Sequence, residues 1–373
     1  MKLSPDQAHA LDVIENGPHN CLFLTGKAGT GKSTVLSQVR GRKVFTALTG
    51  LAASIINGRT LHSFLSMSPH SKKANYYEVS KRLYKHDYLI IDEISMMNTM
   101  LFEEVLNALR FAKFEGKLIL VGDFKQLPPV QGDPCYLAPN WNIVHKVELT
   151  TNHRQADSGY IDVLNDIREG KVTDRLQAFL RERIVDEPPK DYTAIVPLRK
   201  KANKINVQRL SEIEDEPTLF DMKIIEVKQK LFEDEEEYHE LVERSSNFVS
   251  ELVVKEGARV MILVNHPEGQ YVNGSTGTLY RFTSEMMAIK LDDGYSVDIP
   301  RVDMDFCNGA GKVMFVYNQF PVMLAWATTI HKSQGQSIGK LYVDVKGHFE
   351  EGMTYVALSR GKDPNTLRVN DVL

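Results

Sequence analysis

The chain has 373 residues, more than one ordinary hydrophobic core accommodates, so we expect two or more domains. Hydrophobic residues make up 42% and charged residues 25%, which is the balance of a globular protein and excludes a disordered one. The formal net charge of −4 argues against a protein that coats nucleic acid by bulk positive charge, although a narrow basic track on an acidic surface is compatible with it.

Signals for membranes, secretion and structural metals are missing from the sequence. It has no run of about 18 apolar residues, so a membrane span is not expected. Residues 1–17 have neither an apolar signal core nor an Arg-rich transit pattern. Cys21, Cys135 and Cys307 stand far apart, so neither structural zinc nor disulfides are expected. We therefore expect a cytoplasmic protein of a bacterial cell or a phage-infected host.

The first 150 residues alternate short apolar strands with helices. A helix is predicted to begin at Ser4-Pro5 and to end at Gly17-Pro18. This alternation is typical of a parallel sheet wrapped by helices. Strands are predicted at residues 21–26, 43–48, 88–93 and 117–123, and further helices at 32–40 and 98–114.

The alternation resumes after residue 152 and predicts a second α/β domain. A helix is predicted at 159–183 and strands at 193–197, 341–345 and 365–370. Between them, β-like runs in residues 257–315 are broken by turn signals at Asn273-Gly274 and Asp293-Gly294, which indicates a small β-barrel inserted into this domain. The acidic run at 233–240 favours a solvated helix face, with an interaction site as the alternative.

A nucleotide site is predicted between the first strand and the helix that follows it. GKAGTGKS, residues 26–33, matches G-x-x-x-x-G-K-[ST]: the glycines let backbone N–H groups surround phosphate oxygens, and the helix N-terminus adds positive potential. Lys32 is expected to reach the β- and γ-phosphates of ATP, and Ser33 to help hold Mg²⁺. The residues predicted to bind nucleotide here are Gly26, Ala28, Gly29, Thr30, Gly31, Lys32, Ser33 and Thr34.

Two adjacent carboxylates end the apolar strand at 88–93. Asp92 fits the Mg²⁺ carboxylate of a P-loop enzyme, and Glu93 fits a base that deprotonates the attacking water. Taken alone, the pair could be loop surface; together with the P-loop it indicates hydrolysis. The chain also lacks the N-K-x-D guanine signature, which disfavours a Ras-like GTPase.

Ten segments, in chain order, give the sequence a family resemblance. It resembles the superfamily 1 helicases, specifically the 5′→3′ branch that contains RecD, the phage helicase Dda and the PIF (petite integration frequency) family. Among these, its sequence resembles the PIF family most. The segments are LSPDQ, GKAGTGKS, TALTGLAA, GRTLHSF, LIIDEISMM, GDFKQLPPV, LTTNHRQ, VNGSTGTL, LAWATTIHKSQGQS and YVALSRGKD.

The resemblance implies a domain organisation. It predicts two RecA-like P-loop domains with a small SH3-like β-barrel inserted in the second. Domain 1A would span residues 1–152 and include a wedge insertion at about 62–86. Domain 2A would comprise residues 153–256 and 318–373, and barrel 2B residues 257–317.

The resemblance also implies roles around the nucleotide. Gln7 resembles the glutamine that reads adenine, with a helix-surface glutamine as the alternative. Gln126 resembles the γ-phosphate sensor, and Asp123 would support the same water and metal network. The two arginine fingers would come from the second α/β domain and stabilise charge on the transferring phosphoryl group. These fingers are Arg154 and Arg360, and two further nucleotide contacts are expected at Gln334 and Gly335.

DNA contacts are implied on both α/β domains. In the first they are Thr49, Gly50, Thr60, His62, Ser63 and Phe64, and in the second Thr329, His331 and Lys332. Phe64 could equally be a core residue. Pro69 and Tyr76-Tyr77 could form a duplex-splitting wedge or exposed surface, and the basic clusters at 71–73 and 199–201 could be DNA contacts or solvated faces.

The predicted function is an ATP-dependent DNA helicase that moves 5′→3′ along single-stranded DNA and unwinds forked duplex DNA, with ATP and Mg²⁺ as cofactors. The direction comes only from the family resemblance. We expect it to work as a monomer without a membrane, with replication or repair proteins as candidate partners. One alternative is a RecD-like motor subunit of a repair complex. Another is a non-catalytic adaptor, which intact Lys32, Glu93, Gln126, Arg154 and Arg360 disfavour.

Overall fold

The structure is a computed structural model in which the chain forms two compact units. Unit 1 comprises residues 1–169, 309–311 and 350–355, and unit 2 comprises residues 170–308, 312–349 and 356–373. The predicted domain boundaries after residues 152, 256 and 317 remain predictions. The structure describes residues 3–27, 29–49, 52–53, 56–67, 73–151, 158–232, 234–245, 249–266, 268–271, 273–307, 313–334, 336, 338–348 and 352–373.

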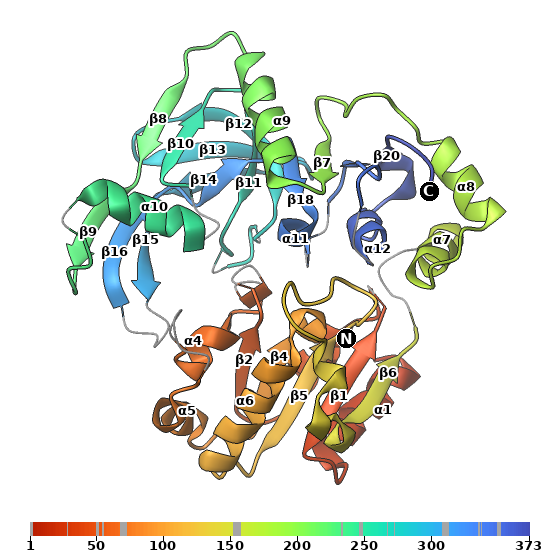
Figure 1. Ribbon diagram of the computed structural model, residues 1–373. Helices are drawn as coiled ribbons and strands as arrows, with labels where there is room; N and C mark the ends of the chain where they lie inside the picture. Colours follow the sequence, from red (N-terminus) through yellow and green to blue (C-terminus); the bar gives the residue numbers. More distant parts are fainter. Residues whose placement is uncertain are drawn as a thin grey trace. The chain divides into compact units, whose positions relative to one another are not determined.

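Unit 1 contains a six-stranded parallel sheet in the order β3-β2-β4-β5-β1-β6 (Figure 1). Its central strands are almost completely buried, as expected for a parallel sheet covered on both faces. The predicted α/β architecture is confirmed, and β3 and β6 are strands that the sequence pattern did not reveal. The strands are β1 (Cys21–Gly26), β2 (Lys43–Ala47), β3 (Arg59–Thr60), β4 (Tyr88–Asp92), β5 (Lys117–Gly122) and β6 (His145–Leu149).

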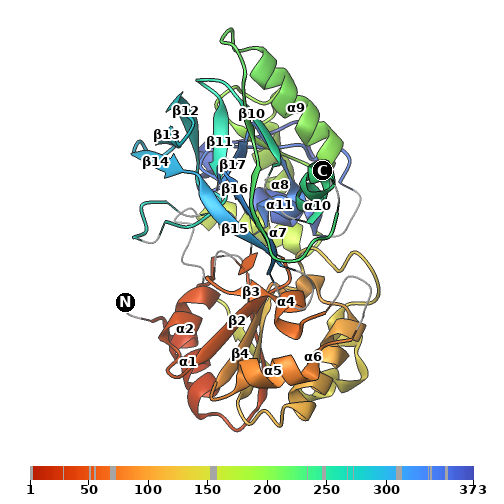
Figure 2. The same cartoon turned by 90° about the vertical axis from the view of Figure 1, so that its left-hand side faces the viewer.

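Helices cover both faces of this sheet (Figures 1 and 2). Because side chains alternate along a strand, Leu24 packs with Ile14 and Val35 of the first two helices, whereas Phe23 packs in a second cluster with Phe64 and Phe102. The first cluster joins α1 and α2 to the sheet, and the second joins α4, α5 and α6. The helices are α1 (Pro5–Asn16), α2 (Lys32–Gln38), α4 (Leu61–Leu65), α5 (Tyr76–Leu83), α6 (Thr99–Phe111) and α7 (Ser158–Arg168), with short 3₁₀ turns η1 (Ile94–Met96), η2 (Cys135–Leu137) and η3 (Pro139–Ile143).

Unit 2 contains a four-stranded parallel sheet in the order β18-β7-β19-β20. Strand β7 pairs with both β18 and β19, so its two neighbours come from far later in the chain. Residues 197–326 leave this sheet after β7 and return to it at β18. The strands are β7 (Thr193–Val196), β18 (Ala327–Thr329), β19 (Leu341–Val343) and β20 (Leu367–Val369).

The intervening residues form antiparallel sheets. Five strands pair in the order β14-β13-β12-β11-β17 around their own apolar core, and glycines with positive φ occupy the predicted turns, Gly274 (91°) and Gly294 (95°). The predicted β-rich insertion is therefore present, whereas its SH3-like assignment stays a prediction. The strands are β11 (Arg259–Ile262), β12 (Thr276–Phe282), β13 (Met286–Leu291), β14 (Ser296–Pro300) and β17 (Val322–Leu324).

Two smaller sheets were not expected from the sequence. Strand β16 pairs with β15 on one side and with β9, a strand about 90 residues earlier, on the other, and β8 pairs with β10. Segments of the predicted barrel thus belong to more than one sheet. The strands are β8 (Thr218–Asp221), β9 (Lys223–Val227), β10 (Glu251–Val254), β15 (Val302–Cys307) and β16 (Val313–Gln319).

An ion pair with a buried arginine joins the antiparallel and parallel sheets of unit 2. The Arg259 guanidinium, 4% exposed, donates to both carboxylate oxygens of Asp292 (3.0 and 2.7 Å) and to the Thr193 hydroxyl in β7 (3.1 Å). Asp292 also accepts a hydrogen bond from the Thr276 hydroxyl (2.6 Å). These contacts fix the orientation of the five-stranded sheet on β7.

The helices of unit 2 refine two predictions. The helix predicted at 159–183 is broken: α7 ends at Arg168, Gly170 has a φ of 67°, and Thr173 caps α8. The acidic run begins α10, with exposed Glu235 to Glu237 and buried Tyr238, as expected for a solvated helix face. No helix in the described ranges is long and apolar enough to cross a membrane. The helices are α8 (Asp174–Arg181), α9 (Arg199–Ser211), α10 (Glu235–Ser245) and α11 (Ile330–Ser333), whereas α12 (Met353–Leu358) has residues 353–355 in unit 1 and residues 356–358 in unit 2.

Candidate functional site

The glycine-rich loop lies between β1 and α2, where the sequence predicted it. Gly29 and Gly31 have φ values of 86° and 80°, a left-handed conformation that disfavours side chains. A Cβ atom on Gly31 would also lie 2.3 Å from the Gln7 Nε2 atom. The left-handed φ therefore favours glycine at position 31, and a larger residue there would also displace the Gln7 side chain.

Hydrogen bonds within the loop hold it in a curved conformation. The Thr30 hydroxyl donates to the Lys27 carbonyl (2.9 Å), and the Lys32 ammonium donates to the carbonyls of Gly26 (2.7 Å) and Lys27 (3.3 Å). Ser33 is exposed in the first turn of α2. The loop thus presents a cation and a helix N-terminus together, which suits a polyphosphate. Thr34 follows in α2, whereas Ala28 lies outside the described residues.

Gln7 is anchored to the loop. Its side chain is 4% exposed; Oε1 accepts a hydrogen bond from the Ser4 backbone N–H, and Nε2 donates to the Thr30 carbonyl, each at 3.1 Å. The helix-surface alternative therefore does not describe this side chain. The contacts join α1 to the phosphate-binding loop, and its reading of adenine remains a prediction.

Asp6 holds the start of α1 against the end of β6. Its carboxylate accepts hydrogen bonds from the backbone N–H groups of Thr150 and Thr151, each at 2.9 Å. Burial opposes the charged form, but hydrogen bonds from Ser4, Thr151 and Thr150 outweigh it and hold the pKa of Asp6 well below its usual range. Asp6 therefore helps to position Gln7.

The carboxylates of the hydrolytic site follow the neighbouring strand ends. Strand β5 pairs with β1 on one side and β4 on the other, so the carboxyl ends of the three strands lie side by side. Burial, and then the adjacent Glu93 carboxylate, raise the pKa of Asp92 to about 7, while the Glu93 N–H bond (2.8 Å) and Lys32 act in the opposite direction. Glu93 has a φ of 55°, which is uncommon for a residue with a side chain.

Gln126 and Asp123 follow β5 at the same edge. Gln126 is 7% exposed, and its backbone N–H donates to the Asp123 carbonyl (2.9 Å). Asp123 is 1% exposed and forms an ion pair with Arg168. The sequence analysis missed Arg168 because this position at the end of α7 belongs to no motif.

Two of the predicted nucleotide contacts, Arg360 and Gln334, lie buried in unit 2. The Arg360 guanidinium, 3% exposed, donates to the carbonyls of Val356 (2.9 Å) and Gln336 (3.3 Å) and to the Ser359 hydroxyl (2.9 Å). Gln334 is 6% exposed at the end of α11. Arg154 and Gly335 lie outside the described residues, so the roles predicted for these four residues stay predictions.

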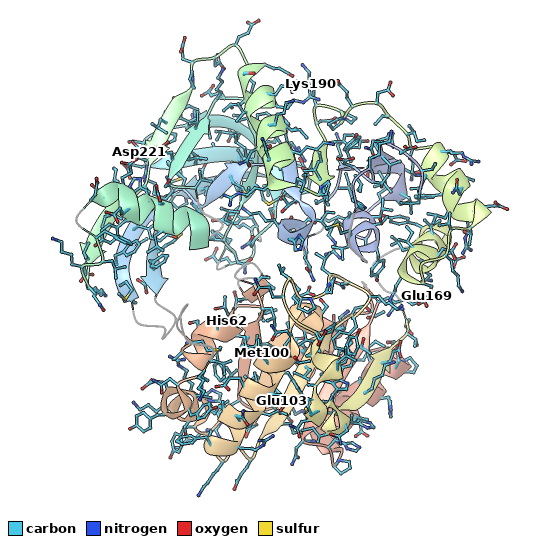
Figure 3. All side chains as sticks on the ribbon, viewed as in Figure 1. His62, Met100, Glu103, Glu169, Lys190 and Asp221 are labelled. Atoms are coloured by element: carbon cyan, nitrogen blue, oxygen red, sulfur yellow. The ribbon has the colours of Figure 1, made fainter. Side chains whose placement is uncertain are left out.

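The predicted DNA contacts of unit 1 differ in exposure. Thr60 caps α4 by accepting a hydrogen bond from the Ser63 N–H (3.3 Å), and His62 is exposed on the same helix (Figure 3). Phe64, in contrast, is 0% exposed and belongs to the apolar cluster beneath α4, which favours its core alternative. The Thr49 hydroxyl accepts a hydrogen bond from the Ala52 N–H (3.1 Å).

Part of the predicted wedge can be examined. The Tyr76 ring packs against Phe111 with centroids 5.4 Å apart, whereas Tyr77 is 64% exposed beneath the Lys81 ammonium (4.3 Å). Only Tyr77 of the pair thus offers an exposed ring. Gly50, Pro69 and residues 71–72 lie outside the described residues.

Cations gather at the carboxyl ends of β7 and β18 in unit 2. These parallel strands are in register at Val196 and Thr329, and each reaches a basic residue three positions later, Arg199 and Lys332. Burial, and then the positive charge of Arg199, lower the pKa of Lys332. In the described part of the chain, neither Arg199 nor Lys332 has a carboxylate partner, whereas Lys201 is paired with Asp344.

Thr329 and His331 complete this cluster. Thr329 caps α11 by accepting a hydrogen bond from the Lys332 N–H (3.4 Å), and His331 is half-buried. Arg199, Lys200 and Lys201 are thus not equivalent, because among the residues that the structure describes only Lys201 is neutralised by an ion pair. The remaining positive charge suits an anionic ligand.

Two of the three cysteines, Cys21 and Cys135, are buried in unit 1. Burial raises the pKa values of the Cys21 and Cys135 thiols to about 12, and both are free. Among the residues that the structure describes, no group of three His, Cys, Asp or Glu side chains could hold a metal ion.

The sheet, the glycine-rich loop and the carboxylates at the neighbouring strand end define a P-loop nucleoside triphosphatase. A family model described as an AAA domain matches residues 2–188. The chain belongs to the Pif1 family: ATP-dependent DNA helicase Pif1 of Bdellovibrio bacteriovorus is 36% identical, covering 96% of this chain and 86% of that protein.

Solved structures of Pif1 proteins share the fold. Pif1 from Bacteroides sp in complex with ADP-AlF4 is 28% identical and has a TM-score of 0.79, covering 100% of this chain and 93% of that chain. Bacteroides Pif1 bound to ssDNA is also 28% identical over the same coverage, with a TM-score of 0.73. These similarities extend through both units of the present chain.

Proposed function

We propose that this chain is an ATP-dependent DNA helicase that moves 5′→3′ along single-stranded DNA and separates the strands of forked duplex DNA. The observation that carries this proposal is the phosphate-binding loop of unit 1, with Lys32 above it and Asp92-Glu93 at the neighbouring strand end, in a member of the Pif1 family. The direction of movement rests on the family resemblance.

The chemistry assigned to the site follows from its charges. Lys32 would bind the β- and γ-phosphates, and Glu93 would accept a proton from the attacking water. The raised pKa of Asp92 supports a cation site, because a buried carboxyl beside a second carboxylate is stabilised in its charged form by a nearby cation. Ser33 and Asp92 would hold Mg²⁺, which neutralises phosphate charge when bound. Arg154 and Arg360 would act as the arginine fingers.

The DNA track would use polar and cationic groups from both units. In unit 1 these are Thr49, Thr60 and His62, and in unit 2 Thr329, His331 and Lys332, joined by Arg199. Backbone phosphates would neutralise the cations of unit 2, and binding would then weaken with added salt. The protein would act as a monomer in the cytoplasm, with replication or repair proteins as partners.

Two measurements on the isolated full chain test the proposal. ATP hydrolysis should rise when single-stranded DNA is added, and a fork with a 5′ tail should be unwound while a 3′-tailed fork is not. Glu93→Gln should lower the rate of hydrolysis at least about 100-fold while nucleotide binding persists.

The outcomes separate the alternatives. DNA-stimulated hydrolysis without unwinding would favour the RecD-like motor subunit. Unwinding of only the 3′-tailed fork would refute the assigned direction. Hydrolysis by Glu93→Gln as fast as by the parent would refute the role of Glu93 as base.

A further inference from the structure

The turn that carries Gln126 is held by a buried ion pair. The Arg168 guanidinium donates from Nε to Oδ2 of Asp123 (3.1 Å) and from Nη2 to Oδ1 (2.9 Å). The side chains are 13% and 1% exposed, respectively. This two-point contact between a planar fork and a carboxylate fixes orientation as well as distance.

Asp123 in turn holds the backbone of the turn that carries Gln126. Its Oδ1 atom accepts a hydrogen bond from the Lys125 backbone N–H (3.1 Å), and its carbonyl accepts one from the Gln126 N–H (2.9 Å). The carboxylate therefore joins α7 to the two residues next to the predicted phosphate sensor. A shift of Asp123 would move the backbone of Gln126.

A third segment of unit 1, residues 352–355, contacts the same turn. The Tyr355 hydroxyl donates to Oδ2 of Asp123 (3.5 Å). Gly352 has a φ of 83°, and a Cβ atom there would lie 2.9 Å from the backbone carbon and oxygen of Gln126. The turn is thus enclosed by α7 on one side and by residues 352–355 on another.

Burying the Asp123–Arg168 ion pair has an energetic cost. Removing an Arg and an Asp from water is costly, and an apolar pair of similar volume is often as stable, so a buried ion pair is weak evidence for a stabilising role. The opposite end of Arg168 is bound as well, since Nη1 donates to Oε1 of Glu169 (2.9 Å; Glu169 is labelled in Figure 3). A guanidinium that donates from all three of its nitrogens is suited to holding one geometry.

We propose that Arg168 is a positioning residue that, through Asp123, holds Gln126 in the conformation that hydrolysis requires. This inference rests on the proposed ATPase function and gives Asp123 a different task from the metal network that the family resemblance implied. Arg168 acts on Gln126 and touches no reacting atom. The chemistry therefore depends on a residue outside the recognised motifs.

The first test compares steady-state ATP hydrolysis by the full chain with Arg168→Ala, Asp123→Ala and the double variant. A sensor displaced by about 1 Å should lower kcat by about 10- to 100-fold, while KM for ATP and the affinity for ADP change less than about threefold. If the pair acts as one unit, the double variant is no slower than the slower single variant. Independent, multiplying effects would overturn the proposal.

Rescue distinguishes positioning from a merely structural role. The pair borders a cavity of about 570 Å³ that is also lined by Gln126 and Trp141. Guanidinium ion at non-denaturing, millimolar concentration should therefore restore kcat of Arg168→Ala and leave the double variant unchanged. Arg168→Lys should recover only part of kcat, because an ammonium lacks the two-point geometry.

Controls keep the result interpretable if Arg168→Ala folds poorly. Tyr355→Phe removes only one hydroxyl and should lower kcat about two- to fivefold through the same turn. Arg181→Ala on α8, whose guanidinium contacts only Gln177 in the described residues, should leave kcat unchanged. A folded Arg168→Ala with parental kcat refutes the positioning role alone, whereas a parent without DNA-stimulated hydrolysis refutes the proposed function.

Discussion

Replacing Phe64 with alanine should destabilise unit 1 and leave the intrinsic affinity for DNA intact. Phe64 lies in a five-residue helix between exposed His62 and buried Leu65, so its position in the motif is compatible with either DNA contact or packing. The structure leaves 0% of its side chain exposed, within the apolar cluster that α4, α5 and α6 form on the sheet. A ring without exposed surface cannot stack on a nucleobase of bound DNA.

The expected magnitude follows from this burial. Truncation of a fully buried phenylalanine to alanine removes the transfer energy of the ring and leaves a cavity, which together cost about 3–5 kcal/mol. For a unit of this size, about 2–4 °C of melting temperature correspond to each kcal/mol, so the transition of unit 1 should fall by roughly 6–20 °C. Phe64→Leu keeps most of the apolar volume and should cost on the order of 1 kcal/mol.

The assay can follow unit 1 alone. The chain has two tryptophans, Trp141 in unit 1 and Trp326 in unit 2, so fluorescence in a Trp326→Phe background reports on unit 1. The affinity for single-stranded DNA should be measured at a temperature well below the unfolding transition. The control is Tyr77→Ala, which removes an exposed aromatic ring on α5 and should lower the folding stability by under about 1 kcal/mol. The reasoning is refuted if Phe64→Ala melts like the parent but binds DNA at least tenfold more weakly.

Three further predictions concern charges. The pKa of Asp6 is depressed in the folded state, so its contribution to folding stability is complete above the unfolded pKa of about 3.9 and is lost as the pH falls below that value. Asp6→Asn should therefore have a lower free energy of unfolding in urea than the parent at pH 7, and equal free energies would contradict this. Lys332→Ala should reduce the salt slope of single-strand affinity by about 0.7, the value for one lost phosphate contact, and a parental slope would remove Lys332 from the track. Lys171→Ala, at an exposed position outside the predicted DNA contacts, serves as the control. Arg259→Ala should lower the stability of unit 2 by about 2 kcal/mol, read from Trp326 fluorescence, since it removes two charge-assisted hydrogen bonds to Asp292, whose side chain is 26% exposed. An unchanged transition would mean that the pair is dispensable.

Local sequence patterns predicted the glycine-rich loop and the strand ends beside it, because the geometry of these segments is determined locally. The turn at Gly29 and Gly31, the cation at Lys32 and the carboxylate at Asp92 each lie within a few residues of a buried strand, so the strand fixes their position. The β-hairpins around Gly274 and Gly294 were predictable for the same reason.

Features that depend on distant partners were not predictable from one sequence. The pairing of β16 with β9 joins segments about 90 residues apart, and nothing within either strand specifies its neighbour. The Asp123–Arg168 contact likewise depends on how α7 packs. For Phe64, a helix of five residues is too short for periodicity to separate its buried from its exposed face.

The strand order of unit 2 has a consequence for biosynthesis. The apolar segment Thr193–Val196 leaves the ribosome more than 130 residues before the strands that flank it on either side, β18 and β19. Throughout that interval its backbone N–H and C=O groups lack their final partners, a condition that promotes mispairing and slow, non-local closure. Premature termination before residue 327 would therefore leave β7 alone out of four strands, so we expect such fragments to be removed by proteolysis.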